Sequence, residues 1–293
     1  MTNILSFDIE EWYLEKVFNG NRNYKYQQFD KKLQEILEEL DKNNIKATFF
    51  CVGKMATEFP GVIRLITSKG HEIGCHSNEH TWLDKMDKAT LKQDTQDAIN
   101  ALEDVSGQKV KSYRAPAFSI TEKNKWAISV LKECGIENDS SIFPAPRDFG
   151  GYPSFSQDTP CRICYQGAEV KEYPICFANV MGKSIAFSGG GYFRMLSNST
   201  IKNMMKKRDY NIFYFHLKDL IDEKIGMLNK KQYEEYFKEP GTLKNRCVRY
   251  LKDNLRFGNV YDKLAGLMTN SSFISVATAS EYINWTEKET IIL

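Results

Sequence analysis

Apolar residues recur with two different periods along the first half of the chain. Short apolar runs rich in β-branched and aromatic residues predict strands at 4–9, 46–53, 71–75, 111–115 and 135–141. Between them, apolar residues return every three or four positions, which predicts helices over 29–43, 58–70, 89–105 and 122–134. The first helix shows this spacing most clearly, at Phe29, Leu33, Ile36, Leu37 and Leu40.

Strands that alternate with helices along the chain predict parallel βαβ units, arranged as an open doubly wound sheet or as a barrel. Both arrangements place functional residues at the carboxyl ends of the strands. No GxGxxG follows the first strand, so a dinucleotide-binding domain loses its main support.

The second half begins with a different kind of segment. Residues 143–195 are rich in proline, glycine and aromatic residues, and we expect a long irregular insertion that shapes a binding cleft. An apolar strand at 211–217, a Lys/Glu-rich helical stretch and a last strand with a short helix at 273–283 should follow. No internal repeat or linker interrupts the chain, so a single domain over residues 1–293 is expected.

Charge and composition exclude several classes of partner. Forty basic against thirty-eight acidic residues give a net charge of +2, far from the basic excess of nucleic-acid binders. No apolar run approaches the ~20 residues that span a bilayer, and the N-terminus lacks a signal-peptide pattern, which predicts a cytoplasmic protein. Seven cysteines, an odd number, predict reduced thiols, and the CxxC at Cys161 and Cys164 is a weak zinc signal.

Two of the four histidines, His76 and His80, stand four positions apart directly after a predicted strand. On one helical turn, two imidazoles at this spacing can share a metal ion. HSNEH also matches the inverted-zincin peptidase motif with Glu79 as the base, although that motif needs a long helix around it. We expect His71 to be structural or exposed to solvent.

Acidic and basic residues lie at the ends of other predicted strands. Asp8 and Glu10 should point to the same side, so that one binds the metal and the other takes a proton, while Glu11 fits a surface position. Arg114 could hold a carboxylate ionised, and the following Pro116 would fix its turn. His216 ends a strand of almost entirely apolar residues, which suggests a proton donor.

The order of these motifs resembles the polysaccharide deacetylase family, also called NodB homology domains or carbohydrate esterase family 4. The resemblance is closest to the bacterial subgroup of exopolysaccharide and surface-glycan biosynthesis. It rests on FDIEEWY, ATFFCVG, GHEIGCHSNEH, YRAPAFS, NDSSIFP, SGGGYFRM and YFHLKDL, in that order. It implies an α/β fold, a distorted (β/α)7 barrel related to the TIM barrel, and a divalent metal, commonly zinc.

Carried over by position, the resemblance implies roles for individual residues. His76, His80 and Glu10 become the metal ligands, Asp8 the general base, oriented by Arg114, and His216 the general acid. This chain has Asp-Ile-Glu-Glu where the commoner family motif has two adjacent aspartates. The further residues expected to contact substrate or support the acid are Pro116, Ala117 through its backbone N–H, Asp139 as partner of His216, Gly190, Tyr192 and Arg194.

The resemblance implies removal of an N-acetyl group from an amino sugar of a glycan or activated precursor, with release of acetate. We expect a nucleotide-linked or lipid-linked sugar rather than finished cell wall. Two alternatives stay open beside the peptidase, an amidohydrolase of a small cyclic amide or ureide and a catalytically silent carbohydrate-binding barrel.

Overall fold

A nine-stranded sheet forms the centre of the computed structural model, which describes all residues except 148–149, 181, 224–225, 238–239 and 256–257. Within the described residues the strand order is β10-β1-β2-β3-β4-β5-β7-β6-β11. The bounds are β1 Thr2–Ile9, β2 Thr48–Cys51, β3 Glu72–Cys75, β4 Ser112–Tyr113, β5 Asn138–Asp139, β6 Cys161–Tyr165, β7 Ala168–Glu172, β10 Tyr210–His216 and β11 Thr290–Ile292.

The strands from β10 through β7 in this order are all parallel to their neighbours. Their carboxyl ends therefore lie along one edge, where Asp8 pairs in register with His216 and Cys75 with Tyr113. The strand β1 lies between β10 and β2 and is buried along almost its whole length, which explains its apolar sequence. The alternating periods predict six of these seven parallel strands, and the seventh, β7, lies in the segment expected to be irregular.

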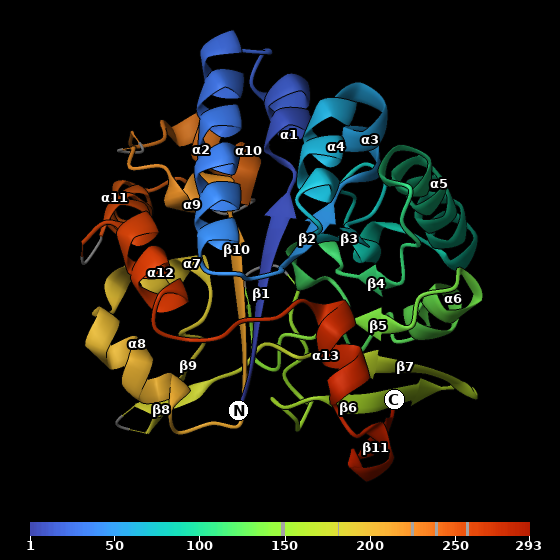
Figure 1. Ribbon diagram of the computed structural model, residues 1–293. Helices are drawn as coiled ribbons and strands as arrows, with labels where there is room; N and C mark the ends of the chain where they lie inside the picture. Colours follow the sequence, from blue (N-terminus) through green and yellow to red (C-terminus); the bar gives the residue numbers. More distant parts are fainter. Residues whose placement is uncertain (148–149, 181, 224–225, 238–239, 256–257) are drawn as a thin grey trace.

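Helices surround these strands, with β1 at the centre (Figure 1). The residues spaced helically from Phe29 to Leu40 form the buried face of α2, which confirms that prediction. The bounds are α1 Glu11–Phe18, α2 Asn23–Lys42, α3 Gly53–Glu58, α4 Pro60–Ser68, α5 Lys88–Ser106, α6 Ala127–Glu133, α7 Gly190–Met195, α8 Asn198–Met205, α9 Leu217–Leu220, α10 Lys230–Phe237, α11 Leu243–Asn254, α12 Val260–Met268 and α13 Val276–Tyr282.

The insertion at 143–195 is more regular than predicted. The strands β6 and β7 pair antiparallel and extend the central sheet, and β8 (Ala178–Val180) pairs with β9 (Lys183–Ile185). Gln166 and Gly167 between β6 and β7 both have positive φ, as a tight two-residue hairpin turn requires. The expectation of an irregular segment is wrong here because a QG pair is a weaker turn signal than NG or DG.

The C-terminal segment also differs from its prediction. The short helix forms as α13, but the strand expected before it is reduced to a single bridge between Ile4 and Ile274. Ser275 already caps α13 by accepting the Thr278 N–H, which leaves no room for a longer strand. The last strand is β11, beside β6.

None of the described helices is long and apolar enough to cross a membrane. All seven cysteines are free thiols, as their odd number predicts. Cys161 is buried and Cys164 is half-buried on the same strand, β6.

Candidate active site

Glu10, His76 and His80 converge at the carboxyl edge of the sheet. The Oε2 atom of Glu10 lies 2.8 Å from Nε2 of His80 and 3.6 Å from Nε2 of His76. The ligand atoms of the three residues all lie within 4.8 Å of one another. We call these three residues the metal trio, because two imidazoles and one carboxylate form a donor set typical of zinc and other divalent metals.

The surroundings of the trio fit a cation. Oε2 of Glu10 is buried and accepts no hydrogen bond from any described residue. Nδ1 of His76 lies 2.7 Å from the carbonyl oxygen of Arg114, so it carries the proton and leaves the lone pair of Nε2 facing Glu10. Burial favours a neutral Glu10, but the charges of Lys218, His216 and His80 outweigh it and lower its pKa well below the ordinary value.

A non-helical backbone brings the two histidines together. Residues 76–80 form no helix, and Ser77 and His80 both have positive φ. The prediction that the histidines share one helical turn is therefore wrong. Backbone bonds from Gly53 and Lys54 to the carbonyls of Ser77 and Asn78 hold the segment instead.

Glu79 points to solvent within this segment. Its side chain is half-exposed and lies 3.5 Å from the ammonium group of Lys54. The inverted-zincin alternative requires a helix that holds this glutamate beside the metal, so the structure removes its support.

Asp8 lies deep beside the trio and pairs with Arg114. Oδ1 of Asp8 is 2.8 Å from Nη1 of Arg114, and both side chains are buried. Ser6 and Ser140 accept further hydrogen bonds from the guanidinium group. Burial tends to raise the pKa of Asp8, but Arg114, His76 and His216 outweigh it and lower the pKa below the ordinary value. Arg114 therefore keeps Asp8 ionised, as predicted.

His216 lies at the end of β10, beside Glu10 and Asp8. Its Nε2 lies 3.4 Å from Oε1 of Glu10 and 3.9 Å from Oδ2 of Asp8, while Nδ1 faces Oδ2 of Asp219 at 3.4 Å. Burial opposes protonation of His216, but Glu10 and Asp219 outweigh it and raise its pKa well above the ordinary value. The imidazolium form of His216 is the state that can give up a proton.

The predicted partner of His216 is wrong. Asp139 lies on β5, separated from β10 by four strands of the sheet, and accepts a hydrogen bond from Ser141. The partner of the His216 side chain is instead Asp219. Its carboxylate also accepts the backbone N–H of His216 and so caps the start of α9. The sequence signal was available, because an aspartate three residues after a helix start often bonds back to it.

Lys218 is a second residue that the sequence prediction missed. Its Nζ lies 3.0 Å from Oε1 of Glu10, so the two oxygens of Glu10 face different groups. Glu11 also differs from its prediction: it is buried and accepts the backbone N–H of Lys218, and burial and the charge of Glu10 raise its pKa.

Pro116 and Ala117 form a short turn after Arg114. Ala117 and Phe118 adopt positive φ, and the backbone of Gly150 packs so closely on their carbonyls that a Cβ there would lie 2.4 Å from either oxygen. Gly151 donates to the carbonyl of Phe118 at 2.9 Å. The insertion therefore braces this turn, while contact of Pro116 and Ala117 with substrate stays a prediction.

The SGGGYFR segment lies behind His216. A Cβ on Gly190 would lie 2.5 Å from Oδ2 of Asp219, so this glycine lets α7 approach the partner of His216 rather than a ligand. Tyr192 is exposed, Arg194 is half-buried and Phe193 is in the core. Contact of Tyr192 and Arg194 with substrate stays a prediction.

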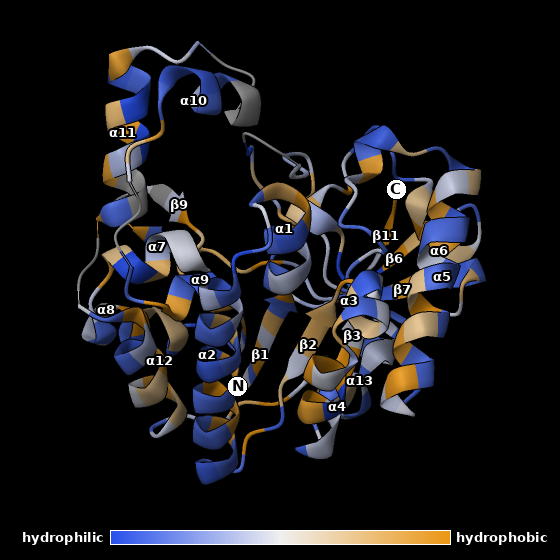
Figure 2. Cartoon of the chain, turned by 90° about the horizontal axis from the view of Figure 1, so that it is seen from above, coloured by the Kyte–Doolittle hydropathy of each residue, from blue (hydrophilic) through white to orange (hydrophobic). Residues whose placement is uncertain are grey.

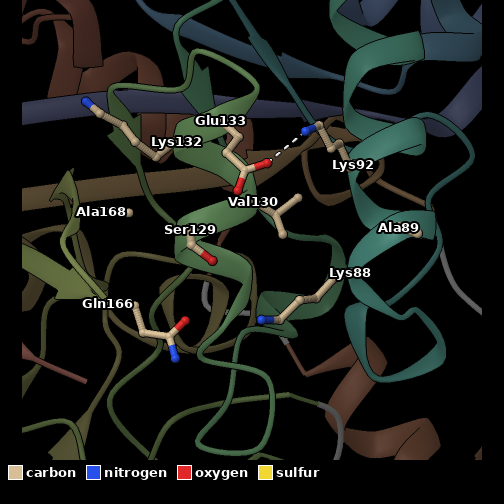
Figure 3. A pocket seen from close by; sticks show the side chains of 9 residues that line it. All are labelled: Lys88, Ala89, Lys92, Ser129, Val130, Lys132, Glu133, Gln166 and Ala168. Carbon is tan, nitrogen blue, oxygen red and sulfur yellow. Dashed lines mark hydrogen bonds and ion pairs between the residues drawn. The ribbon is translucent and has the colours of Figure 1, made fainter.

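Two surface hollows differ in their relation to the site. The larger, about 610 Å³, lies between α5 and α6, and Lys92 in its wall pairs with Glu133 at 2.8 Å (Figure 3). It includes no residue of the metal trio. The smaller, about 350 Å³, is lined by Trp82 and Ser119, among others. It is close to the site along the chain, because Trp82 follows His80 of the metal trio by two residues.

Two family models match the chain in succession. Residues 20–138 match the model described as polysaccharide deacetylase. This part of the chain is therefore similar to the polysaccharide deacetylase family. Residues 140–280 match a domain of unknown function, DUF3473. The first match includes His76, His80 and Arg114, and the second includes His216, while Asp8 and Glu10 precede both.

Curated relatives match this chain over part of their length. It is 34% identical over 94 residues to a peptidoglycan-N-acetylglucosamine deacetylase of Bacillus cereus, covering 32% of this chain and 34% of the relative. It is 32% identical over 104 residues to a chitin deacetylase of Pestalotiopsis sp, covering 34% of each. The chain thus spans about a third of the length of these relatives.

A solved structure confirms the fold of this chain. A candidate polysaccharide deacetylase from Mycobacterium smegmatis is similar with a TM-score of 0.64 at 20% identity, covering 100% of this chain and 93% of that one. Together with the parallel strands, this confirms the predicted distorted (β/α)7 barrel. The exopolysaccharide subgroup and a single domain over residues 1–293 stay predictions.

Proposed function

We propose that this chain is a metal-dependent hydrolase that removes an N-acetyl group from an amino sugar and releases acetate. The observation that carries the proposal is the convergence of three groups at one edge of the sheet. These groups are the metal trio, Asp8 with Arg114, and His216 with Asp219. The relatives named for peptidoglycan-N-acetylglucosamine and chitin support an N-acetylated sugar as the substrate.

Glu10, His76 and His80 would hold a divalent metal, for which zinc is our first expectation. When bound, such an ion supplies Lewis acidity that polarises a carbonyl and makes water more acidic. The lone pair of His76 Nε2 and Oε2 of Glu10, which faces both histidines, suit this role. Lys218 holds the other oxygen of Glu10 and so fixes which one faces the histidines.

Asp8 serves as the base and His216 as the acid. Arg114 occupies Oδ1 of Asp8, which leaves Oδ2 on the side of His216 to accept a proton from the attacking water. Nε2 of His216 faces the same space and donates its proton to the leaving nitrogen, while Asp219 steadies Nδ1. The water proton thus goes to Asp8, the acyl group leaves as acetate, and the sugar leaves as a free amine.

A catalytically silent barrel fits the site less well. Binding of a carbohydrate alone does not require a buried aspartate whose pKa is lowered by arginine, or a nearby histidine whose pKa is raised. Both groups are in place around the trio. The geometry thus favours hydrolysis over binding alone.

The substrate is proposed to be an activated precursor, either nucleotide-linked or lipid-linked, which accords with the expected cytoplasmic location. Acetate release from N-acetylated nucleotide sugars, lipid-linked glycans, chitin oligomers and small cyclic amides tests this proposal. We expect release from one of the first two. Release from finished polymer alone would contradict the precursor proposal, and hydrolysis of cyclic amides alone would contradict the deacetylase proposal.

A further inference from the structure

The helix α11 turns its apolar side chains outward. Within the described part of the chain, fifteen large apolar side chains are exposed, and five of them lie on this helix or directly after it. They are 38% to 63% exposed and recur at a spacing that places most of them along one side of the helix. These residues, which we call the α11 stripe, are Leu243, Val248, Tyr250, Leu251 and Leu255.

Two polar side chains on the opposite side of α11 form hydrogen bonds with neighbouring segments of the chain. Arg246 donates to the carbonyl of Leu228, and Asn245 donates to that of Pro240. Asn245 and Arg246 are both half-buried. A surface helix of a globular protein normally has the reverse arrangement, with its apolar side inward. The α11 stripe therefore faces outward because the helix is fastened through its polar side.

Positive charge accompanies the stripe. The sequence 243–257 contains five lysines and arginines against one aspartate, a net charge of +4, while the whole chain has only +2. Lys244 is exposed beside Leu243. Figure 2 shows α10 and α11 together at one corner of the molecule. An exposed helix that combines apolar and basic side chains is suited to the surface of an anionic membrane.

We propose that α11 seats this protein on an anionic lipid surface. The leucines of the α11 stripe enter the headgroup region, and Lys244 meets the lipid phosphates. A second copy of the chain is a poorer occupant, because pairing two stripes would bring two +4 segments together. Docking bears on the substrate only if the proposed function holds, in which case it brings the site to glycans carried on membrane lipids.

Co-sedimentation of the full chain with vesicles tests the proposal. We expect binding to phosphatidylcholine vesicles that contain phosphatidylglycerol and little binding to phosphatidylcholine alone. Leu251→Glu should weaken binding at least about tenfold, because it removes an apolar contact and adds a negative charge. Lys244→Gln should weaken it about fivefold through the loss of one charge.

Tyr282→Glu is the matched control, because Tyr282 on α13 is 79% exposed and the charge change equals that of Leu251→Glu. It should bind vesicles like the natural protein. Vesicle binding that Leu251→Glu leaves unchanged, or no binding by the natural protein, would overturn the proposal. So would a dimer that forms without vesicles and that Leu251→Glu dissociates.

Acetate release from a soluble substrate, measured on the same proteins, separates docking from catalysis. Leu251→Glu should release acetate like the natural protein. If none of the proteins releases acetate while vesicle binding follows the expected order, the proposed function fails and the docking surface stands.

Discussion

Glu10 lies at the centre of four positively charged or metal-binding groups of the site. Lys218 and His216 face one of its oxygens, and His76 and His80 face the other. Because Lys218, His216 and His80 lower its pKa well below the ordinary value, Glu10 is ionised in the neutral range and would bind a cation without first releasing a proton. Burying a carboxylate costs desolvation free energy, so a carboxylate kept at this position suggests a function.

Asp8→Asn separates the base from the ligands. The amide keeps a hydrogen-bond acceptor for Arg114 but accepts no proton from water, so turnover should fall by about 10²–10⁴. The metal content should stay at the natural level, since Asp8 lies outside the trio. Elemental analysis beside acetate release checks both quantities. Loss of the metal would instead make Asp8 a ligand.

Asp219→Asn should change the pH dependence of turnover. Asp219 helps to raise the pKa of His216, and the acid acts only while protonated, so activity disappears as pH rises through that pKa. Without the negative charge at Asp219 the pKa is lower, and the alkaline loss of kcat/KM should occur at a lower pH. A profile identical to that of the natural protein would show that Asp219 only caps α9.

At the scale of elements, α7 packs against Asp219, the partner of the proposed acid His216. Lys263 holds its C-terminal end by donating to the carbonyls of Phe193, Arg194 and Leu196 at 2.8, 3.0 and 3.1 Å. Its N-terminal Gly190 packs against Asp219. The position of α7 therefore helps to set the position of His216.

Gly190→Ala tests this support. The new Cβ would lie 2.5 Å from Oδ2 of Asp219, so Asp219 must shift and turnover should fall about tenfold or more, with the metal content retained. Gly191→Ala is the control, because a Cβ at Gly191 meets nothing within 4 Å. Equal turnover in the two variants would exclude a positioning role for α7.

His71 links β2 and β3 away from the site. It is buried, contrary to a solvent-exposed position, and its Nδ1 accepts the N–H of Ala47 at 3.3 Å. Burial lowers its pKa to about 4 in the folded state, against about 6.5 when unfolded. The folded state therefore resists protonation, and the stability that His71 contributes above pH 6.5 is lost as pH falls toward 4.

His71→Gln should remove this pH dependence. Urea unfolding at pH 7 and pH 4 should show the natural protein losing up to about 3 kcal/mol more of its unfolding free energy than the variant. The comparison uses the change with pH, so a lower starting stability of the variant does not affect it. The same pH-dependent loss in both proteins would contradict a buried neutral His71.

At the scale of the whole molecule, the sequence predicts those helices and strands whose apolar residues recur at a regular spacing. The period of α2 and the apolar runs of β1 and β10 come from burial against the core, so they are visible without knowledge of the fold. Parallel strands then bring their ends together, which is why Asp8, His76 and Arg114 could be placed at one site in advance.

Contacts between distant segments could not be predicted in the same way. The approach of His76 and His80 depends on two residues with positive φ, which no periodicity reports. Asp139 is excluded as the partner of His216 only once the strand order separates β5 from β10. The strands of the insertion escaped prediction because β8 and β9 are short and the turn between β6 and β7 carries only a weak sequence signal.

The central claim is tested most directly by metal content and acetate release measured together on the natural protein, His76→Ala and His216→Ala. We predict that the natural protein binds a divalent ion and releases acetate from an N-acetylated sugar, with loss of activity on chelation. His76→Ala should lose both the ion and the activity, whereas His216→Ala should keep the ion and lose about 10²–10⁴ in turnover. Full metal content and full acetate release by His76→Ala would contradict the account.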